Sequence, residues 1–226
     1  MHPAFDFALR RLREHADTEH LSGQAYFGKS TTARLGVKVP MIRALAKELG
    51  SDESLALALW GCGIPEARIL ACMVMPATAL DVKMMNAWVA DFDSWDVCDQ
   101  TCLNLFCRSA LAWPRLNAWA KQDSEYERRA AFALLACLAV HDKKAPDSQF
   151  VDTFPLIEAY AFDGRNFVKK AVNWALRQVG KRNAVLCAQA IECAHRVHAQ
   201  ASPSAKWIAS DALRELQGRP NVRSQA

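Results

Sequence analysis

The sequence lacks long apolar runs. No stretch reaches the roughly 18 consecutive apolar residues that a membrane-crossing helix needs. The N-terminal segment MHPAFDFALRRLREH has the pattern of an amphipathic helix with early charge, which differs from that of a signal peptide. We therefore expect a cytoplasmic protein that does not associate with a membrane.

Several catalytic and metal-binding signatures are also missing. The chain has no Gly-rich phosphate loop and no Gly-x-Ser-x-Gly elbow, which argues against nucleotidases and hydrolases of those types. Cys98, Cys102 and Cys107 fit neither a CxxC pair nor a common iron–sulfur run, and the six histidines are scattered. We predict no metal and no cofactor. The eight cysteines lie within helical patterns, so we expect free thiols.

The alternating pattern of half-buried strands is absent as well, whereas helical periodicity runs almost throughout. Pro40, Pro65 and Pro114 fall at expected first-turn positions, where a missing N–H costs little. The predicted helices are 4–15, 20–29, 40–49, 52–61, 65–75, 81–92, 95–107, 114–121, 125–140, 147–161, 165–181, 183–199 and 204–217.

These helices are short and joined by links of a few residues, which favours stacked antiparallel pairs over one four-helix bundle. With 226 residues and 51% apolar content, the chain can bury a continuous core along such a stack. We predict an all-α fold: an α-solenoid of HEAT-like antiparallel helix pairs that forms a curved superhelix with a concave basic groove. Residues 1–218 are expected to form one repeat domain, monomeric in solution, and 219–226 a frayed polar tail.

The most informative stretch is 165–182, RNFVKKAVNWALRQVGKR. On a helix, Lys170, Trp174, Arg177 and Lys181 share one stripe, and the apolar side chains Val168, Val172, Ala175 and Val179 lie opposite. The window holds six positive side chains and no acid. Such a face predicts an anionic partner, and Trp174 strengthens the prediction because an exposed indole needs a contact. The alternative is a solvated surface face.

A second stretch is 92–107, FDSWDVCDQTCLNLFC. Trp95 and Asp99 are four residues apart, so on a helix the indole and the carboxylate share a face. In the alternative interpretation Trp95, Cys102 and Phe106 point inward and Asp99 is tied to a neighbouring helix end. Asp96 is predicted to be a first-turn acid, and Ser94 to cap this helix.

Two further stretches carry basic residues. In 125–145, Arg129 begins a face continued by Ala133 and Ala136, so we expect room for a phosphate to approach its guanidinium, unless Arg129 pairs with an acid of an adjacent helix. In 25–50, Tyr26 ends an early helix. Lys29, Arg34 and Lys38 make the following connection basic, and Arg43 and Lys47 then share one side of the next helix, an arrangement suited to phosphate contacts.

The segments YFGKSTTARLGVKVPMIRALAKE, SWDVCD, RRAAFALL and FVKKAVNWALRQVGKRN, in this order, resemble the AlkD-like family of DNA alkylation repair glycosylases. The resemblance spans about residues 20 to 185. It implies a HEAT-like solenoid that holds duplex DNA and excises positively charged lesions such as 3-methyladenine and 7-methylguanine.

The same resemblance implies residue roles. Asp99 matches the catalytic carboxylate, and Trp95 and Trp174 match the two indoles that flank it. Arg129 matches an arginine near the phosphate of the lesion, Tyr26 a tyrosine that lines the cleft, and Arg177 a basic residue after the second tryptophan. This chain departs from the family at Ser94, where a second tryptophan is frequent, and at Cys137, where we associate the family with a lysine that binds the DNA backbone.

Two classes of function follow from these patterns. One is a metal-independent glycosylase of alkylated duplex DNA, with Asp99, Trp95 and Trp174 in catalysis. The DNA-binding residues are then predicted to be Arg129, Tyr26, Arg177, Lys170, Lys181, Lys38 and Arg43. The other is a non-catalytic HEAT-like scaffold that binds branched DNA, RNA or a protein through the same groove.

Overall fold

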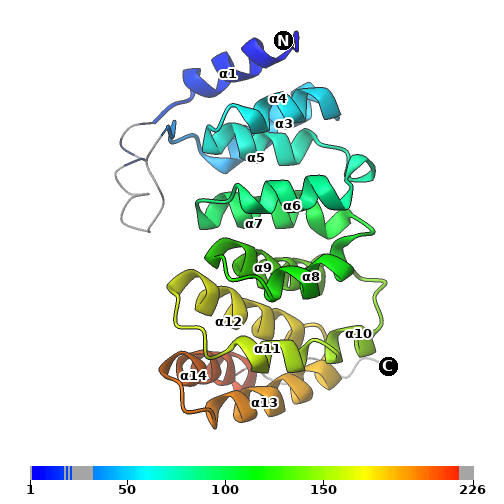
Figure 1. Ribbon diagram of the computed structural model, residues 1–226, viewed down its shortest axis with the longest axis vertical. Coiled ribbons are helices and arrows are strands. Elements are labelled where there is room, and N and C mark those ends of the chain that lie inside the picture. Colours follow the sequence, from blue (N-terminus) through cyan, green and yellow to red (C-terminus); the bar gives the residue numbers. More distant parts are fainter. Residues whose placement is uncertain (1, 18, 20, 22–32, 219–226) are drawn as a thin grey trace. The chain divides into compact units, whose positions relative to one another are not determined.

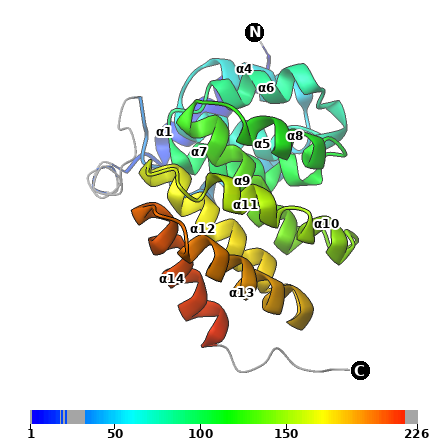
Figure 2. The same cartoon turned by 60° about the horizontal axis from the view of Figure 1, so that its bottom comes forward.

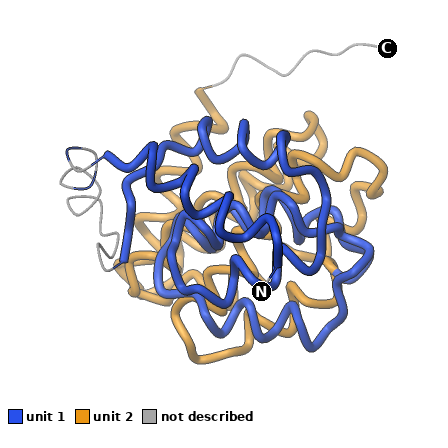
Figure 3. Tube along the Cα trace, turned by 90° about the horizontal axis from the view of Figure 1, so that it is seen from above, with its two compact units in different colours: residues 1–111 blue, residues 112–226 orange. Residues whose placement is uncertain are grey.

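The computed structural model describes residues 2–17, 19, 21 and 33–218 of the chain, and every regular element in these residues is a helix (Figure 1). The helical part of the fold prediction is therefore confirmed. The chain divides into two compact units, residues 1–111 and 112–226 (Figure 3).

Unit 1 is built around helix α5. Helices α3, α4 and α7 pack against α5, which is buried along most of its length. The helices of this unit are α1 (Phe5–Glu14), α3 (Val39–Leu49), α4 (Glu53–Gly61), α5 (Pro65–Val74), α6 (Val82–Ala90) and α7 (Trp95–Asn104), with 3-10 turns η1 (Ala77–Ala79) and η2 (Phe106–Arg108).

Unit 2 is built around helix α9, which packs against α8 and α12 and is apolar on nearly all sides. Helices α12, α13 and α14 lie side by side (Figures 1 and 2). The helices of this unit are α8 (Ala112–Ala120), α9 (Glu125–His141), α10 (Asp147–Val151), α11 (Phe154–Tyr160), α12 (Asn166–Gly180), α13 (Ala184–His198) and α14 (Pro203–Gln217).

Most predicted helices lie within a few residues of the observed ones, and all three prolines occupy first turns. The single helix predicted for 147–161 is wrong, because Pro155 lacks an N–H and its ring would clash with the carbonyl of Val151. The chain breaks there into α10 and α11, and the Thr153 hydroxyl donates to Phe150 O at 2.6 Å. The helix predicted for 95–107 ends at Asn104 and continues as η2. The predicted helix 20–29 and the tail 219–226 lie outside the described residues, apart from Leu21.

Candidate nucleic-acid interface

Helix α7 carries the candidate carboxylate. Trp95 and Asp99 are both half-buried, whereas Val97, Cys98 and Cys102 on the other side of the helix are fully buried. Cys102 and Phe106 thus point inward, as the alternative interpretation requires, but Trp95 stays partly accessible beside Asp99. The partly exposed side of α7 therefore presents an indole and a carboxylate one turn apart.

The start of α7 is fixed by a buried cluster that the sequence patterns did not indicate. Arg34 donates to both carboxylate oxygens of Asp96, at 2.7 and 2.9 Å, and to Ser94 Oγ at 2.9 Å. All three residues are buried. Asp96 lies in the first turn, as predicted, and Ser94 stands at the N-cap position, but the Ser94 side chain makes no capping hydrogen bond. The Asp96 carboxylate and the Ser94 hydroxyl accept hydrogen bonds from the buried Arg34 guanidinium, and these bonds compensate for its lost contact with water.

The connection before α3 is also fixed by Glu66, a residue of α5. Glu66 is buried and accepts hydrogen bonds from the backbone N–H groups of Leu35 at 3.1 Å and Gly36 at 2.9 Å. Gly36 has φ +78°, and a Cβ there would lie 2.2 Å from the carbonyl oxygen of Asp17, so only glycine fits. Glu66 therefore fixes the backbone at Leu35 and Gly36, and Arg34, which we expected to contact phosphate, is buried.

Of the other predicted residues in this connection, Lys38 is exposed and lies 3.6 Å from a carboxylate oxygen of Asp17. Because both side chains are in solvent, this ion pair adds little to stability and can open for an anion. Tyr26 and Lys29 lie outside the described residues.

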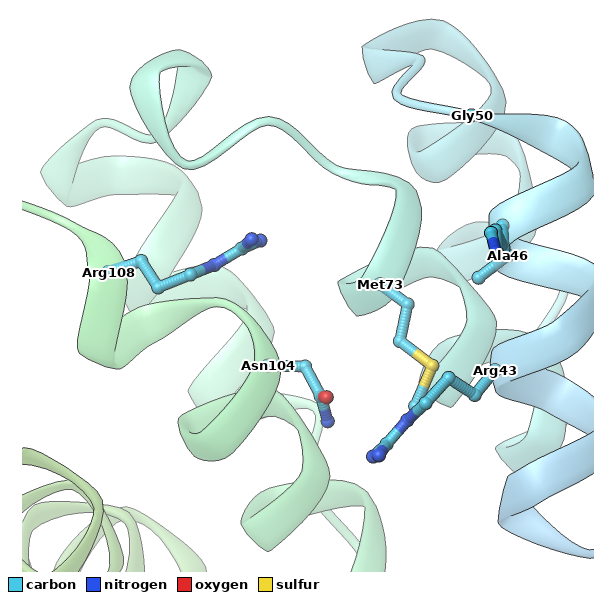
Figure 4. Close-up of a pocket in the computed structure, with 7 residues that line it drawn as sticks. Arg43, Ala46, Gly50, Met73, Asn104 and Arg108 are labelled. Atoms are coloured by element: carbon cyan, nitrogen blue, oxygen red, sulfur yellow. The ribbon is translucent and has the colours of Figure 1, made fainter. Parts of the chain in front are cut away.

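Arg43 lines a pocket of about 270 Å³ formed entirely within unit 1 (Figure 4). In Figure 4, Arg108 and Asn104 project from one side and Arg43 and Met73 from the other. The remaining lining residues are Ala46, Lys47 and Gly50.

In unit 2, helix α12 buries its apolar side as predicted, since Val168, Val172, Ala175 and Val179 have no exposed surface. Lys170 is exposed on the opposite side, and Trp174 is half-buried. Oriented by its hydrogen bonds, the Gln178 amide oxygen accepts from Trp174 Nε1 at 3.1 Å. The polar edge of the indole is therefore held while part of the ring stays accessible.

The two C-terminal cations of the α12 stripe are neutralised by α14. Lys181 Nζ lies 2.9 Å from Glu215 Oε1, and Arg177 pairs with both Glu215 and Asp211. Burial raises the pKa of Glu215, but hydrogen bonds from Lys181 and Arg177 outweigh burial and lower it. The absence of acids within 165–182 thus does not leave these charges unbalanced, because acids reach them from the next helix pair.

The other cations of the same window are also engaged within unit 2. Arg165 bonds both carboxylate oxygens of Asp163, at 2.6 and 3.0 Å. Arg182 donates to the backbone carbonyl of Ala139 at 2.7 Å and lies over the ring of Phe150. The Lys169 ammonium lies 4.9 Å from the ring centre of Trp207 on α14. Lys170 alone in this window pairs with no partner among the described residues.

Arg129 is held inside unit 2. Its guanidinium donates to Phe167 O at 2.6 Å, and the residue is only 5% exposed. The expectation that Ala133 and Ala136 leave room around it is wrong, because both alanines are fully buried where α9 packs against its neighbours. The alternative, that Arg129 pairs with an acid of an adjacent helix, stays a prediction.

Beside Arg129 lies a second buried ion cluster that sequence spacing did not reveal. Asp163, between α11 and α12, accepts from Arg128 at 2.7 Å as well as from Arg165. Burial raises the pKa of Asp163, but the hydrogen bonds from Arg165 and Arg128 outweigh it and lower the pKa to about 2. The cluster links α9 to the start of α12.

Within the described residues, no group of three or more His, Cys, Asp or Glu side chains could hold a metal ion. No described helix is both long and apolar enough to cross a membrane. The predicted encounter of Asp99 and Trp95 with Trp174 and Arg129 joins residues of the two units and stays a prediction.

Comparisons with known proteins add the family. One solved structure matches with a TM-score of 0.77 and 16% sequence identity, and the alignment covers 98% of this chain and 99% of that one. It belongs to a family of proteins described as related to the HEAT-like repeat DNA glycosylases, with affinity for branched DNA structures. The likeness confirms the HEAT-like fold. No curated protein matches. The family model for DNA alkylation repair enzymes matches residues 8–216, and the chain belongs to this family.

Proposed function

We propose that the chain is a DNA glycosylase that excises positively charged N-alkylated purines, such as 3-methyladenine and 7-methylguanine, from duplex DNA. The observation that carries this proposal is the partly exposed side of α7, where Asp99 and Trp95 stand one turn apart. A half-buried carboxylate beside an indole is suited to stabilising a developing positive charge.

The proposed reaction needs no metal and no protonation of the leaving group. An N-alkylated purine already carries positive charge, so the glycosidic C1′–N bond can break with its electron pair moving to the base, which leaves as a neutral molecule. The sugar gains oxocarbenium character, and the Asp99 carboxylate stabilises that charge. Water then attacks C1′ and loses a proton, which leaves an abasic site.

The remaining predicted residues take supporting roles in this proposal. Trp174 and Trp95 supply electron-rich ring faces for the cationic sugar or lesion. Lys170, Lys38 and Arg43 are exposed and available to DNA phosphates. Arg177 and Lys181 would have to leave Glu215, and Arg129 would act from a nearly buried position, so we assign these three the weaker contacts.

The test is release of free alkylated base from methylated duplex DNA, measured in single turnover with excess protein. Asp99→Asn is expected to lower the rate by about 10²- to 10³-fold, the usual cost of one electrostatic catalytic group, while DNA affinity is retained. Asp93→Asn, which alters an exposed acid two residues before the helix, is the matched control. Base release by Asp99→Asn at the wild-type rate would show that the carboxylate is wrongly assigned.

A second candidate is a non-catalytic protein that binds branched DNA. It is favoured by the buried Ser94, whose hydroxyl serves Arg34 where many family members carry a second tryptophan, and by the branched-DNA affinity described for the structural relative. This candidate predicts tighter binding to a four-way junction than to a duplex of equal length. It also predicts no base release from methylated DNA by the wild-type protein.

A further inference from the structure

The pocket between α3, α5 and the end of α7 collects three cations from two separate parts of the chain. Arg43 and Lys47 come from α3, and Arg108 comes from η2. All three side chains are exposed, and none pairs with an acidic side chain of the described residues. This differs from the α12 stripe, where Glu215 and Asp211 balance Arg177 and Lys181.

The cations repel one another in the free protein. Arg43 and Lys47 are four residues apart on one helix, and a like-charged pair at that spacing destabilises the helix. Lys47 in the last turn of α3 gains some compensation from the helix dipole, but Arg43 in the middle of the helix does not. Arg108 adds a third charge to the same opening (Figure 4).

The effect of these charges reaches into the core of unit 1. Burial raises the pKa of Cys72, on α5, to about 12, while the positive charges of Arg108 and Arg43 act in the opposite direction. Both guanidiniums line this pocket and lie near enough to Cys72 for their charges to act on its thiol.

The walls of the pocket suit an oxyanion. Two arginines offer planar, multiple N–H donors, which match the geometry of phosphate oxygens better than ammonium groups do. The Asn104 amide nitrogen donates to the carbonyl and the side chain of Gln100, which holds the amide in place at the pocket wall. Small residues, Ala46 and Gly50, keep the opening wide.

We infer that this pocket is a phosphate-docking site that receives the sugar–phosphate backbone of one DNA strand, with Arg43 and Arg108 as its principal donors and Lys47 and Asn104 at its walls. The inference rests on the proposed DNA-binding function and adds Arg108, Lys47 and Asn104 to the predicted DNA-binding residues. Because the donors carry charge, binding here is expected to weaken as the salt concentration rises.

The experiment compares two double variants of the full chain that lose the same charge. Arg43→Ala/Arg108→Ala removes the donors, and Lys83→Ala/Lys121→Ala removes two exposed cations that neither line the pocket nor pair with an acid of the described residues. Affinity for an unmodified duplex of about 20 base pairs is measured by fluorescence anisotropy between about 50 and 200 mM salt, the range over which phosphate contacts show their salt dependence. Thermal unfolding confirms that both variants fold.

The pocket variant is expected to lose at least about 10-fold in affinity, and the slope of log affinity against log salt should fall by about 1 to 2, because about 0.9 is lost per phosphate contact. Equal effects of the two double variants would overturn the inference. Arg43→Lys/Arg108→Lys keeps the charge but loses the planar donors, so it should bind with intermediate affinity.

Two further arms separate the possible sources of phosphate and the two proposals. If millimolar pyrophosphate raises the melting temperature of the wild type but not of the pocket variant, and DNA affinity is equal in both, the site binds small free phosphates and the strand assignment is overturned. At saturating protein, the control variant Lys83→Ala/Lys121→Ala should release alkylated base at the wild-type rate. Absence of base release from the wild type refutes the glycosylase proposal. The difference in DNA affinity between the pocket variant and the control variant still tests whether the pocket binds DNA.

Discussion

The two basic regions of the molecule differ in what lies across from them. On α12, the cations Arg177 and Lys181 face the acids of α14 at ion-pair distance. At the α3–α5–α7 pocket, Arg43, Lys47 and Arg108 face one another and no acid of the described residues. The denser run of positive charge along the sequence is thus the one with less positive charge available to a partner. The density of positive charge along one helix does not predict how much of that charge a partner meets, because acids distant in sequence can neutralise it.

The largest effect is expected where a carboxylate neutralises arginines inside unit 2. Asp163 pairs with both Arg128 and Arg165. Asp163→Asn leaves the buried Arg128 with only the exposed Asp123 as a counter-charge, 3.5 Å away, and is expected to lower the free energy of unfolding by about 3–5 kcal/mol. Urea unfolding at neutral pH measures the change. Asp152→Asn, at an exposed acid of the same unit, should have an effect below about 0.5 kcal/mol.

The same carboxylate has a pH signature. Its folded-state pKa is lowered from 3.8 to about 2, so its contribution to stability is complete above pH 3.8 and is lost as the pH falls through about 2. Asp163→Asn should lack this part of the acid destabilisation. An unchanged acid profile in the variant would mean that the arginines do not depend on Asp163.

The difference between the two basic regions should become smaller when Glu215, which pairs with cations of the α12 stripe, is removed. Glu215→Gln should release Lys181 and leave Arg177 with Asp211 alone, and it should raise DNA affinity by about 3- to 10-fold at low salt, with a steeper salt dependence. Its cost in stability should be about 1 kcal/mol or less, because the pair is partly exposed. Glu192→Gln on α13 changes the net charge equally and is the control. No gain over that control would indicate that the α12 stripe does not meet DNA.

The smallest expected effect separates two lysines on the same stripe. Lys170 is exposed and pairs with no acid of the described residues, whereas Lys181 is paired with Glu215. Lys170→Ala should weaken DNA binding by about 2- to 5-fold, and Lys181→Ala by less than about 2-fold, since the second charge is already compensated. The reverse order would show that the Lys181–Glu215 pair opens when DNA binds.

Periodicity sufficed for the helices because each must bury one side, and the apolar residues of α12 show this directly. That Asp99 and Trp95 share one side of α7 also followed from a spacing of four residues, but their partial exposure did not. The buried clusters around Asp96 and Asp163 did not, because their partners Arg34 and Arg128 lie 62 and 35 residues away. No local pattern distinguishes an arginine that ends in the core from one that stays in solvent.

The Arg34–Asp96 pair also bears on how the chain is made. The two residues are separated by 62 positions, so the arginine leaves the ribosome several seconds before its partner at typical synthesis rates. Until α7 has been synthesised, Arg34 cannot pair with Asp96, so its charged side chain is more stable in water than in the core. The N-terminal unit is therefore expected to reach its final form only after the helix that carries Asp99 has been synthesised.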